Sequence, residues 1–369
     1  MTYLCFRMAV LLWLLAVSAW CRAEEVRGSP AAHVLPGEFA SEHWEFTARF
    51  DSGHLLFIEF IVTNIGLGDR NAAVLGHVVF PDGKVQRFTN GRREGNWTLA
   101  PDRLRMEVGA SLLDLHGPLY QLQVSKRSVK LDVRFRPDAQ PLWAQAISPP
   151  GYALDLLAVA ATTEGTLWVN GMAAPVHVRG RIAATHSWTN TVGSALILRR
   201  VEFFSLQERC PVYAIDLTAP DGTRRRWLVV RAPDQADYAS EHFDLAFTGA
   251  LHGISEHGYE VPGMLQLKNA HLEGQVRLES LILQVDPLVD LPRPFHYLVS
   301  LALNLRPRKI WALSQLETSF CAAVLTTADH GQEKGITAVT FLNPLPPSLM
   351  TTHRVRYGAT KYLTAAPLD

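Results

Sequence analysis

Residues 181–207 read RIAATHSWTNTVGSALILRRVEFFSLQ and lie near the middle of the 369-residue chain. The stretch begins with a polar group that carries two rings, Thr185–Trp188, and continues through a turn-prone run as far as Gly193. An apolar strand follows, which carries Arg199 and Arg200 and ends in two phenylalanines. The sequence on both sides is rich in strand-like patterns, so we interpret this stretch as the junction between two β-rich units.

The sequence before the junction is nearly all strand-like. Residues Val129–Arg136 alternate between apolar and charged side chains, which is typical of a strand with one buried face. Tight turns separate the strands: Pro81 presets φ, Asp82 bonds to nearby backbone and Gly83 accepts a positive φ. Many short strands with tight turns predict an antiparallel sandwich or barrel. We assign residues 41–184 to an N-terminal β-barrel.

The sequence after the junction has the same style, and we assign residues 185–369 to a C-terminal β-barrel. The turn Pro220–Gly222 lies between strand-like segments, as the first Pro-Asp-Gly turn does, which suggests an internal duplication. The segment Asp286–Pro307 differs, because four prolines surround an apolar run. It predicts a short helix, a barrel lid, a surface for peripheral membrane contact or a buried connector between the domains. Further strands are predicted at Leu265–Asn269, Val276–Gln284, Thr318–Leu325, Gly335–Phe341 and His353–Leu363.

Residues 1–23 have the pattern of a signal peptide, with a basic residue, an uncharged apolar core and small residues before the cleavage point. The apolar core is too short for a membrane-spanning helix. Trp20 precedes Cys21 where a lipoprotein signal needs a small residue, which argues against lipidation of that cysteine. We therefore predict cleavage after Ala23, a linker over residues 24–40, and export to the periplasm or the extracellular space.

The composition is that of a globular protein with an apolar core. Hydrophobic residues make up 48% of the chain and charged residues 19%, which argues against disorder. Lys plus Arg equals Asp plus Glu at 35 each, so no excess of positive charge favours nucleic acid as a partner. The mature chain keeps Cys210 and Cys321, which form either a disulfide or two buried thiols.

Familiar catalytic and metal-binding motifs are missing from the sequence. It contains no GxSxG, Walker, HExxH or CxxC motif, and no GxGxxG follows a first strand. The 14 histidines are scattered rather than spaced like metal ligands. We therefore expect neither a metal nor a cofactor.

The most site-like cluster is His186-Ser187-Trp188, within the junction. These side chains either line a cavity, with His186 as a proton donor or acceptor near neutral pH, or close the mouth of a barrel. A second aromatic-charged group opens the first unit. There we expect Trp44 to plug the base of a barrel and Glu45 to pair with an arginine.

Charged residues also interrupt two apolar strands. A period of two places Arg200 and Glu202 on one strand face and Arg199 on the other. One arginine is therefore expected to point into an apolar interior, held by a partner or an anionic head group, with an ion pair between the domains as the alternative. Glu59 lies among apolar residues, where either a raised pKa for acid–base work or a buried pair with an arginine explains it.

Several short motifs resemble a known family. The sequence Glu42–Thr47 leads into a Gly53–Leu56 turn and a strand that ends at Thr63-Asn64, and His186–Trp188 and Arg199–Ser205 follow later. Together they resemble the two-domain lipocalin-like family of the yeast oxidative-stress survival factor. AttH-like secreted proteins and carotenoid 1,2-hydratases belong to the same wider group, which is similar to fungal lipocalin-like Diels–Alderases. The resemblance covers essentially the whole mature chain.

The resemblance implies an all-β protein of two tandem lipocalin-like antiparallel β-barrels of calycin type, packed side by side, with an apolar cavity in one or between both. Members of the group carry or act on lipids, carotenoids and polyenes. Ala184 and Thr185 precede His186 where the hydratases have acidic or aromatic neighbours, which argues against hydratase chemistry.

We predict an exported protein that binds or carries a hydrophobic small molecule, a lipid or isoprenoid. One alternative is a hydratase, isomerase or cyclase acting on a polyene or isoprenoid, with His186 and one of Glu45, Glu59 and Glu202 as the acid–base pair. Another is a structural protein of the cell envelope. The expected ligand-binding residues are Trp44, His186, Trp188, Arg199, Arg200 and Glu202.

Overall fold

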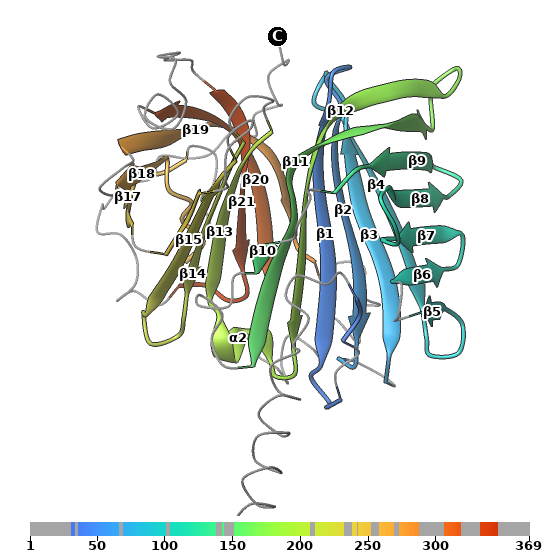
Figure 1. Cartoon of the computed structure of the whole chain (residues 1–369), viewed down its shortest axis with the longest axis horizontal. Coiled ribbons are helices and arrows are strands. Elements are labelled where there is room, and N and C mark those ends of the chain that lie inside the picture. Colours follow the sequence, from blue (N-terminus) through green and yellow to red (C-terminus); the bar gives the residue numbers. More distant parts are fainter. Residues whose placement is uncertain are drawn as a thin grey trace, which may run out of the picture.

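The computed structural model is nearly all β, with two curled antiparallel sheets that lie side by side (Figure 1). This confirms the predicted fold class. The predicted signal peptide, Cys210, Cys321 and the predicted strand His353–Leu363 lie outside the described residues. The structure describes residues 31–33, 36–65, 69–100, 104–137, 142–143, 151–206, 211–231, 238–241, 243–251, 258–268, 273–287, 306–318 and 333–345.

The first sheet has 12 strands and curls into a half-barrel. Its order is β4-β3-β2-β1-β12-β11-β9-β8-β7-β6-β5, with β10 paired to β11. The two ends of this order approach each other, and the Asn90 side chain of β4 donates a hydrogen bond to the Val108 carbonyl of β6, 2.5 Å away. The strands are β1 Ser41–Phe50, β2 Leu55–Thr63, β3 Asn71–Val79, β4 Val85–Arg92, β5 Thr98–Ala100, β6 Arg105–Val108, β7 Ser111–Asp114, β8 Tyr120–Ser125, β9 Val129–Phe135, β10 Leu142–Trp143, β11 Tyr152–Val169 and β12 Val176–Thr189.

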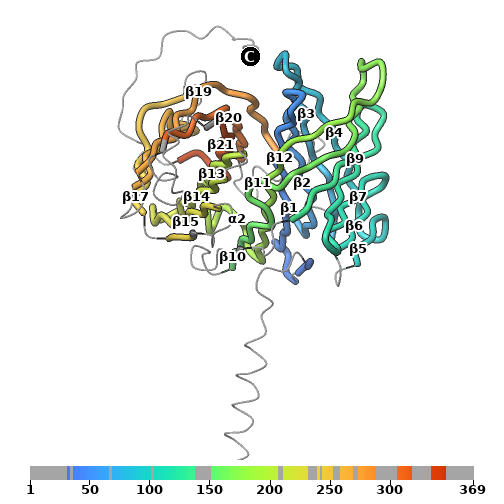
Figure 2. Tube along the Cα trace, turned by 45° about the horizontal axis from the view of Figure 1, so that its top comes forward, coloured from blue at the N-terminus to red at the C-terminus, as the bar shows by residue number. Residues whose placement is uncertain are grey.

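The second sheet has nine strands in the order β16-β15-β14-β13-β21-β20-β19-β18-β17. In both sheets the first strand pairs with the second strand and also with the last one, β1 with β12 and β13 with β21. Figure 2 shows the two sheets curling as separate bodies with β11, β12 and β13 between them. The strands are β13 Arg199–Ser205, β14 Val212–Thr218, β15 Arg224–Val230, β16 Tyr238–Ser240, β17 Asp244–Thr248, β18 Met264–Lys268, β19 Glu273–Val285, β20 Arg308–Thr318 and β21 Glu333–Phe341.

Both Pro-Asp-Gly segments form the predicted tight turns. Gly83 and Gly222 have φ of 80° and 84°, the left-handed region that glycine enters without strain. Asp82 and Asp221 each accept a hydrogen bond from the backbone two residues later, at 3.0 and 2.8 Å. The first turn joins the third and fourth strands of its sheet, whereas the second joins the second and third. The two turns are therefore not equivalent and do not support a duplication. The strand order does support one, because the first strand of each sheet pairs with both the second strand and the last.

Side-chain alternation divides the buried residues into three layers. One lies inside the first half-barrel and includes Trp44, Phe46 and Phe60, and a second lies inside the other half-barrel around Phe203 and Phe341. The third layer lies between the two sheets, because the outward faces of the central strands are apolar too. Its larger members are Leu55, Phe57, Ile197, Phe204, Tyr213, Trp227, Trp311 and Ile336.

The predicted domain boundary at residue 184 lies within a strand. Strand β12 continues to Thr189, five residues beyond the expected boundary at residue 184, because it pairs with β1 along the whole length from Ser41 to Phe50. The short helix α2, Gly193–Leu196, then leads into β13 at Arg199.

The later strands agree with the prediction only in part. Strands β18, β19 and β21 overlap three of the predicted strands. The sequence did not predict β20, Arg308–Thr318. Most of the predicted strand Thr318–Leu325 and most of the proline-rich segment Asp286–Pro307 lie outside the described residues. In the part of the chain that the structure describes, no helix has the length and hydropathy to cross a membrane.

Candidate functional site

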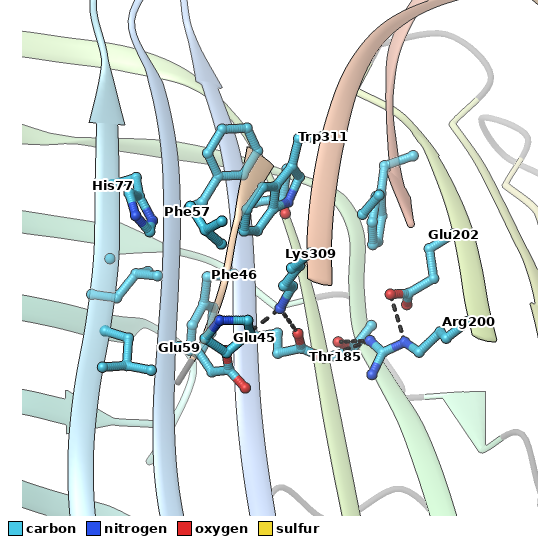
Figure 3. A pocket seen from close by; sticks show the side chains of 18 of the residues that line it. Glu45, Phe46, Phe57, Glu59, His77, Thr185, Arg200, Glu202, Lys309 and Trp311 are labelled. Atoms are coloured by element: carbon cyan, nitrogen blue, oxygen red, sulfur yellow. Dashed lines mark hydrogen bonds and ion pairs between the residues drawn. The ribbon is translucent and has the colours of Figure 1, made fainter. Parts of the chain in front are cut away.

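A pocket lies between the two sheets, lined by β1, β2 and β3 on one side and by β13 and β20 on the other (Figure 3). Aromatic and aliphatic side chains, among them Phe57, Phe204 and Trp311, form its walls. Charged side chains from both sheets lie at its base. The cavity volume is about 50 Å³, and the whole depression with its open, solvent-filled part measures about 670 Å³.

Strand alternation brings the charged side chains to this place. On β1 the even-numbered residues such as Phe46 point into the first half-barrel, so Glu45 points toward the second sheet. On β13 Phe203 points into the second half-barrel, so Arg200 and Glu202 point toward the first sheet. Lys309 arrives from β20 and completes a set of alternating charges.

The charged groups form one continuous network. Arg200 bridges two carboxylates, with Nη2 2.5 Å from Oε2 of Glu45 and Nε 2.6 Å from Oε2 of Glu202. Lys309 Nζ contacts Oε1 of Glu45 and lies 3.5 Å from Oε2 of Glu59. The hydroxyl of Tyr213 donates a hydrogen bond of 2.8 Å to Oε1 of Glu202. The network therefore ties β1 and β2 of the first sheet to β13, β14 and β20 of the second.

A histidine continues the network toward solvent. Nδ1 of His43 lies 2.7 Å from Oε1 of Glu59, and Nε2 of His43 contacts the hydroxyl of Ser41. The His43 side chain is 31% exposed and that of Glu59 is 20% exposed. The imidazole therefore connects the half-buried carboxylate of Glu59 with bulk water.

The carboxylates of the network differ in proton affinity. Burial alone raises the pKa of Glu45, but Arg200 and Lys309 outweigh burial and hold that pKa well below its ordinary value. Lys309 likewise lowers the pKa of Glu59 below its ordinary value, although burial acts in the opposite direction. Burial raises the pKa of Glu202 in spite of the opposing charge of Arg200, and the negative charge of Glu45 adds to the rise. Glu202 is thus the carboxyl group that takes up a proton first.

The number of charges in the network agrees with this order of proton affinities. The three carboxylates Glu45, Glu59 and Glu202 face the two permanent cations Arg200 and Lys309, which leaves one excess negative charge when the imidazole is neutral. A buried excess charge is costly, so the network favours binding one further proton. The structure thus combines apolar walls with a network of three carboxylates and two cations.

The predicted pairing of His186 with one of these carboxylates is wrong. His186 is fully buried on the opposite face of the first sheet, among side chains of the half-barrel interior. Its Nε2 lies 2.8 Å from Oε1 of Glu42, and its ring stacks on that of Trp44 at 4.7 Å between centroids. Burial lowers the pKa of His186, partly offset by Glu42. The ring of Trp188 lies near it on the same face, at 4.8 Å.

Arg199 is the inward-pointing arginine that the alternation predicted. It lies inside the second half-barrel, where its guanidinium covers the Phe247 ring at 4.8 Å and its Nη2 lies 3.4 Å from the hydroxyl of Thr218. Burial lowers its pKa to about 10, against the opposing effect of Asp216. The six predicted ligand-binding residues thus fall in three places, and only Arg200 and Glu202 lie at the pocket.

The sequence also missed several pocket residues. Lys309 and Trp311 lie on β20, which was not predicted as a strand, although the alternation of Ile310 and Ala312 with longer side chains is a strand signal. Tyr213 of β14, which donates a hydrogen bond to the network although it does not line the pocket, was not singled out either. Glu59 was expected either to have a raised pKa or to pair with an arginine, but its pKa is lowered and its partners are Lys309 and His43.

Comparison with solved structures places the fold. An AttH protein from Nitrosomonas europaea superimposes with a TM-score of 0.60 at 12% identity, over 85% of this chain and 95% of that one. The structure of CghA with Sch210972 gives a TM-score of 0.57 at 12% identity, over 87% of this chain and 96% of that one. Kievitone hydratase from Nectria haematococca gives a TM-score of 0.55 at 12% identity, over 86% of this chain and 96% of that one. No protein-family model and no curated protein matches the sequence.

At such low identity the likeness concerns the fold alone, and it spans both sheets. The resemblance to AttH-like proteins is confirmed at this level. The resemblance to the yeast survival factor stays a prediction.

Proposed function

We propose that the protein binds a hydrophobic small molecule with one polar group in the pocket between the sheets, and catalyses acid–base chemistry of the hydratase or isomerase kind there. The observation that carries this proposal is the network of three carboxylates and two cations beside the apolar walls of the pocket. A pure lipid carrier does not need three carboxylates and two cations in its pocket, because such a pocket requires only a few polar groups to orient the ligand.

The carboxyl group of Glu202 is the proton donor in this proposal, and Glu59 is the acceptor. Addition of water to a double bond takes one proton from Glu202 to one carbon and joins the water oxygen to the other. Glu59 accepts the proton that the water loses and passes it to His43, 2.7 Å away. Exchange with solvent through His43 and the network returns the proton to Glu202. The net reaction adds one water molecule.

Lys309 and Arg200 have a different part in the proposed reaction. They keep Glu45 and Glu59 ionised, and their positive charge favours a ligand group that is electron-rich, such as a carbonyl or phenol oxygen. The rings of Phe57 and Trp311, 4.7 Å apart, offer flat apolar surface for the ligand body.

Size restricts where a ligand binds. A cavity of about 50 Å³ holds one or a few water molecules, so an organic ligand occupies the open part and displaces side chains of the wall.

Two proteins that share the fold are consistent with this class of activity: one is a hydratase of kievitone, and the other was crystallised with Sch210972.

The test is incubation of the purified full chain with polyenes, isoprenoids, phenolic alkenes and long-chain lipids, followed by mass spectrometry of the extracted ligand. We expect a product 18 mass units heavier, or an isomer of equal mass, that is lost in Glu202→Gln. The matched control is Glu164→Gln, an exposed glutamate in β11 whose nearest cation, Arg179, lies 3.9 Å away.

The outcomes separate three functions. A product that persists in Glu202→Gln contradicts the assigned proton donor. Saturable binding with unchanged ligand means carriage without turnover, the function that the sequence first predicted. Absence of both binding and product leaves a structural role in the cell envelope.

We further propose that the protein is exported after cleavage behind Ala23, on the pattern of residues 1–23. Sequencing of the N-terminus of the protein from its own cells tests this. A mature chain that begins at Met1, or an acylated Cys21, would contradict it.

A further inference from the structure

We propose that His33, Glu42 and His186 form a binding site for a divalent transition-metal cation such as Zn²⁺. The three residues each offer one ligand atom, and these atoms all lie within 4.8 Å of one another. Two imidazole nitrogens and one carboxylate oxygen favour Zn²⁺ and related cations over Mg²⁺ and Ca²⁺, which prefer oxygen ligands only. Scattered positions in the sequence concealed this group.

Three separate segments bring the ligand atoms together. Glu42 lies on β1 and His186 on the neighbouring β12, both buried on the inner face of the first half-barrel. His33 belongs to the segment that precedes β1, and its side chain is exposed. The site thus has two fixed ligands in the sheet and one ligand at the surface, from which a cation can enter.

The spacing suits a metal centre. Nε2 of His186 lies 2.8 Å from Oε1 of Glu42. Ligand atoms about 2.0–2.1 Å from a tetrahedral zinc lie about 3.3 Å from each other, so a small outward shift admits the cation. The proton that Nε2 shares with the carboxylate leaves when the cation binds. Three protein ligands leave one coordination position open.

The other nitrogen of His186 has a suitable outer partner. Asp155 of β11 lies directly opposite His186 in the sheet register, and both side chains are buried. Oδ1 of Asp155 and Nδ1 of His186 have no hydrogen-bond partner among the described residues. Cross-strand neighbours have Cβ atoms about 4.5–5.5 Å apart, within reach of a direct or water-mediated contact. A carboxylate behind a ligating histidine is the usual outer arrangement at zinc sites.

Aromatic rings hold the exposed ligand in place. The His33 ring stacks on Trp188, with 3.8 Å between centroids and an angle of 20°. Its backbone N–H donates a hydrogen bond of 2.9 Å to Oε1 of Glu42. The Trp44 ring stacks on that of His186. The surface ligand is therefore preorganised before any cation binds.

This site is independent of the proposed function. Glu42 and His186 point into the half-barrel, whereas Glu45 and Thr185 of the same two strands line the pocket on the opposite face. Failure of the acid–base proposal leaves the metal site unaffected, and the reverse also holds.

The experiment uses the metal-stripped full chain without a polyhistidine tag. Calorimetric titration with ZnCl₂ measures stoichiometry and affinity, and titration with Co²⁺ measures the visible absorption that reports coordination geometry. Fluorescence of Trp44 and Trp188 is a third readout, since both rings stack on the ligands. The variants are His33→Ala and Glu42→Gln, and the control is His116→Ala, an exposed histidine outside the group.

We expect one Zn²⁺ per chain, a strong tetrahedral Co²⁺ band and a change in tryptophan fluorescence. His33→Ala removes an exposed side chain and leaves the fold intact, so at least a tenfold loss of affinity in this variant supports the site. The control should match the unmodified chain. Absence of saturable binding in the unmodified chain would overturn the proposal. So would an affinity in His33→Ala and Glu42→Gln equal to that of the unmodified chain.

Discussion

Substitution of Lys309 by methionine is the sharpest test of the network between the sheets. Lys309 contacts Glu45 and lies 3.5 Å from Glu59, and these two carboxylates are direct cross-strand neighbours in β1 and β2. Like charges directly opposite each other destabilise a sheet. Methionine keeps the length and the apolar stem of lysine, so the substitution removes mainly the charge.

Two estimates bracket the magnitude of the effect. Burial lowers the pKa of Lys309, but Glu45 and Glu59 raise it further, to about 12 from 10.5. Each pKa unit corresponds to about 1.4 kcal/mol, so the ammonium contributes about 2 kcal/mol. The side chain is only 12% exposed, so solvent screening takes little of this away. Breaking a buried ion pair costs about 3–5 kcal/mol. We expect Lys309→Met to lower the free energy of unfolding by about 3 kcal/mol.

The measurement is urea unfolding at pH 7, together with a thermal melt. At about 2–4 °C per kcal/mol for a protein of this size, the Tm should fall by about 6–12 °C. The control is Lys268→Met, which removes a strand lysine whose partner Glu273 lies 3.7 Å away with both side chains mostly exposed. That variant should change stability by less than about 0.5 kcal/mol.

A second substitution checks the cause. Adding Glu59→Gln to Lys309→Met removes the repulsion between Glu59 and Glu45, so it should restore part of the lost stability. Equal effects of Lys309→Met and Lys268→Met would refute the reasoning and mean that the charges between the sheets are solvated.

Three further predictions concern the charged network and one of the tight turns. A double-mutant cycle on Arg200→Met and Glu202→Gln should give a coupling energy of about 2 kcal/mol, since the pair is buried at 2.6 Å; a value near zero contradicts the pairing. The lowered pKa of Glu45 contributes stability above pH 4.5 that is lost as the pH falls below it. The stability gap between the unmodified chain and the lysine variant should therefore narrow from pH 7 to pH 3, and a constant gap would argue against ionised carboxylates. Gly222→Ala should lower the free energy of unfolding by about 1–2 kcal/mol because the φ of Gly222 is 84°. Gly91→Ala should cost little, because a Cβ added at Gly91 meets open space. Equal effects of the two substitutions would exclude backbone strain as the cause.

The fold was predictable because its signals are local. Alternation predicted the strands of the first unit, and Pro-Asp-Gly predicted two tight turns that the structure contains. The same alternation placed Arg200 and Glu202 on one face and Arg199 on the other, as observed. A period of two depends only on the pleat of a strand, so it needs no knowledge of the partner sheet.

The composition of the pocket was only partly predictable, because it depends on contacts between distant segments. Lys309 and Glu45 are 264 residues apart, and His186 and Glu42 are 144 residues apart. Alternation tells which residues share a face, but not what that face contacts. His186 was therefore assigned to the carboxylates of the wrong face, while its partner Glu42 was not considered.

The two faces of β1 explain why one short motif suggested a single site where the structure has two. Glu42, Trp44 and Phe46 point into the half-barrel, and His43 and Glu45 point toward the second sheet. An isolated barrel would expose these last two side chains to water, where they need no partner. Packing the second sheet against β1 leaves His43 partly exposed but removes the water from Glu45. The charge of Glu45 then requires opposite charges, which Arg200 of β13 and Lys309 of β20 supply. Because such pairing tolerates little displacement, the network favours one relative position of the two sheets, and the same requirement places proton-exchanging groups beside the apolar walls.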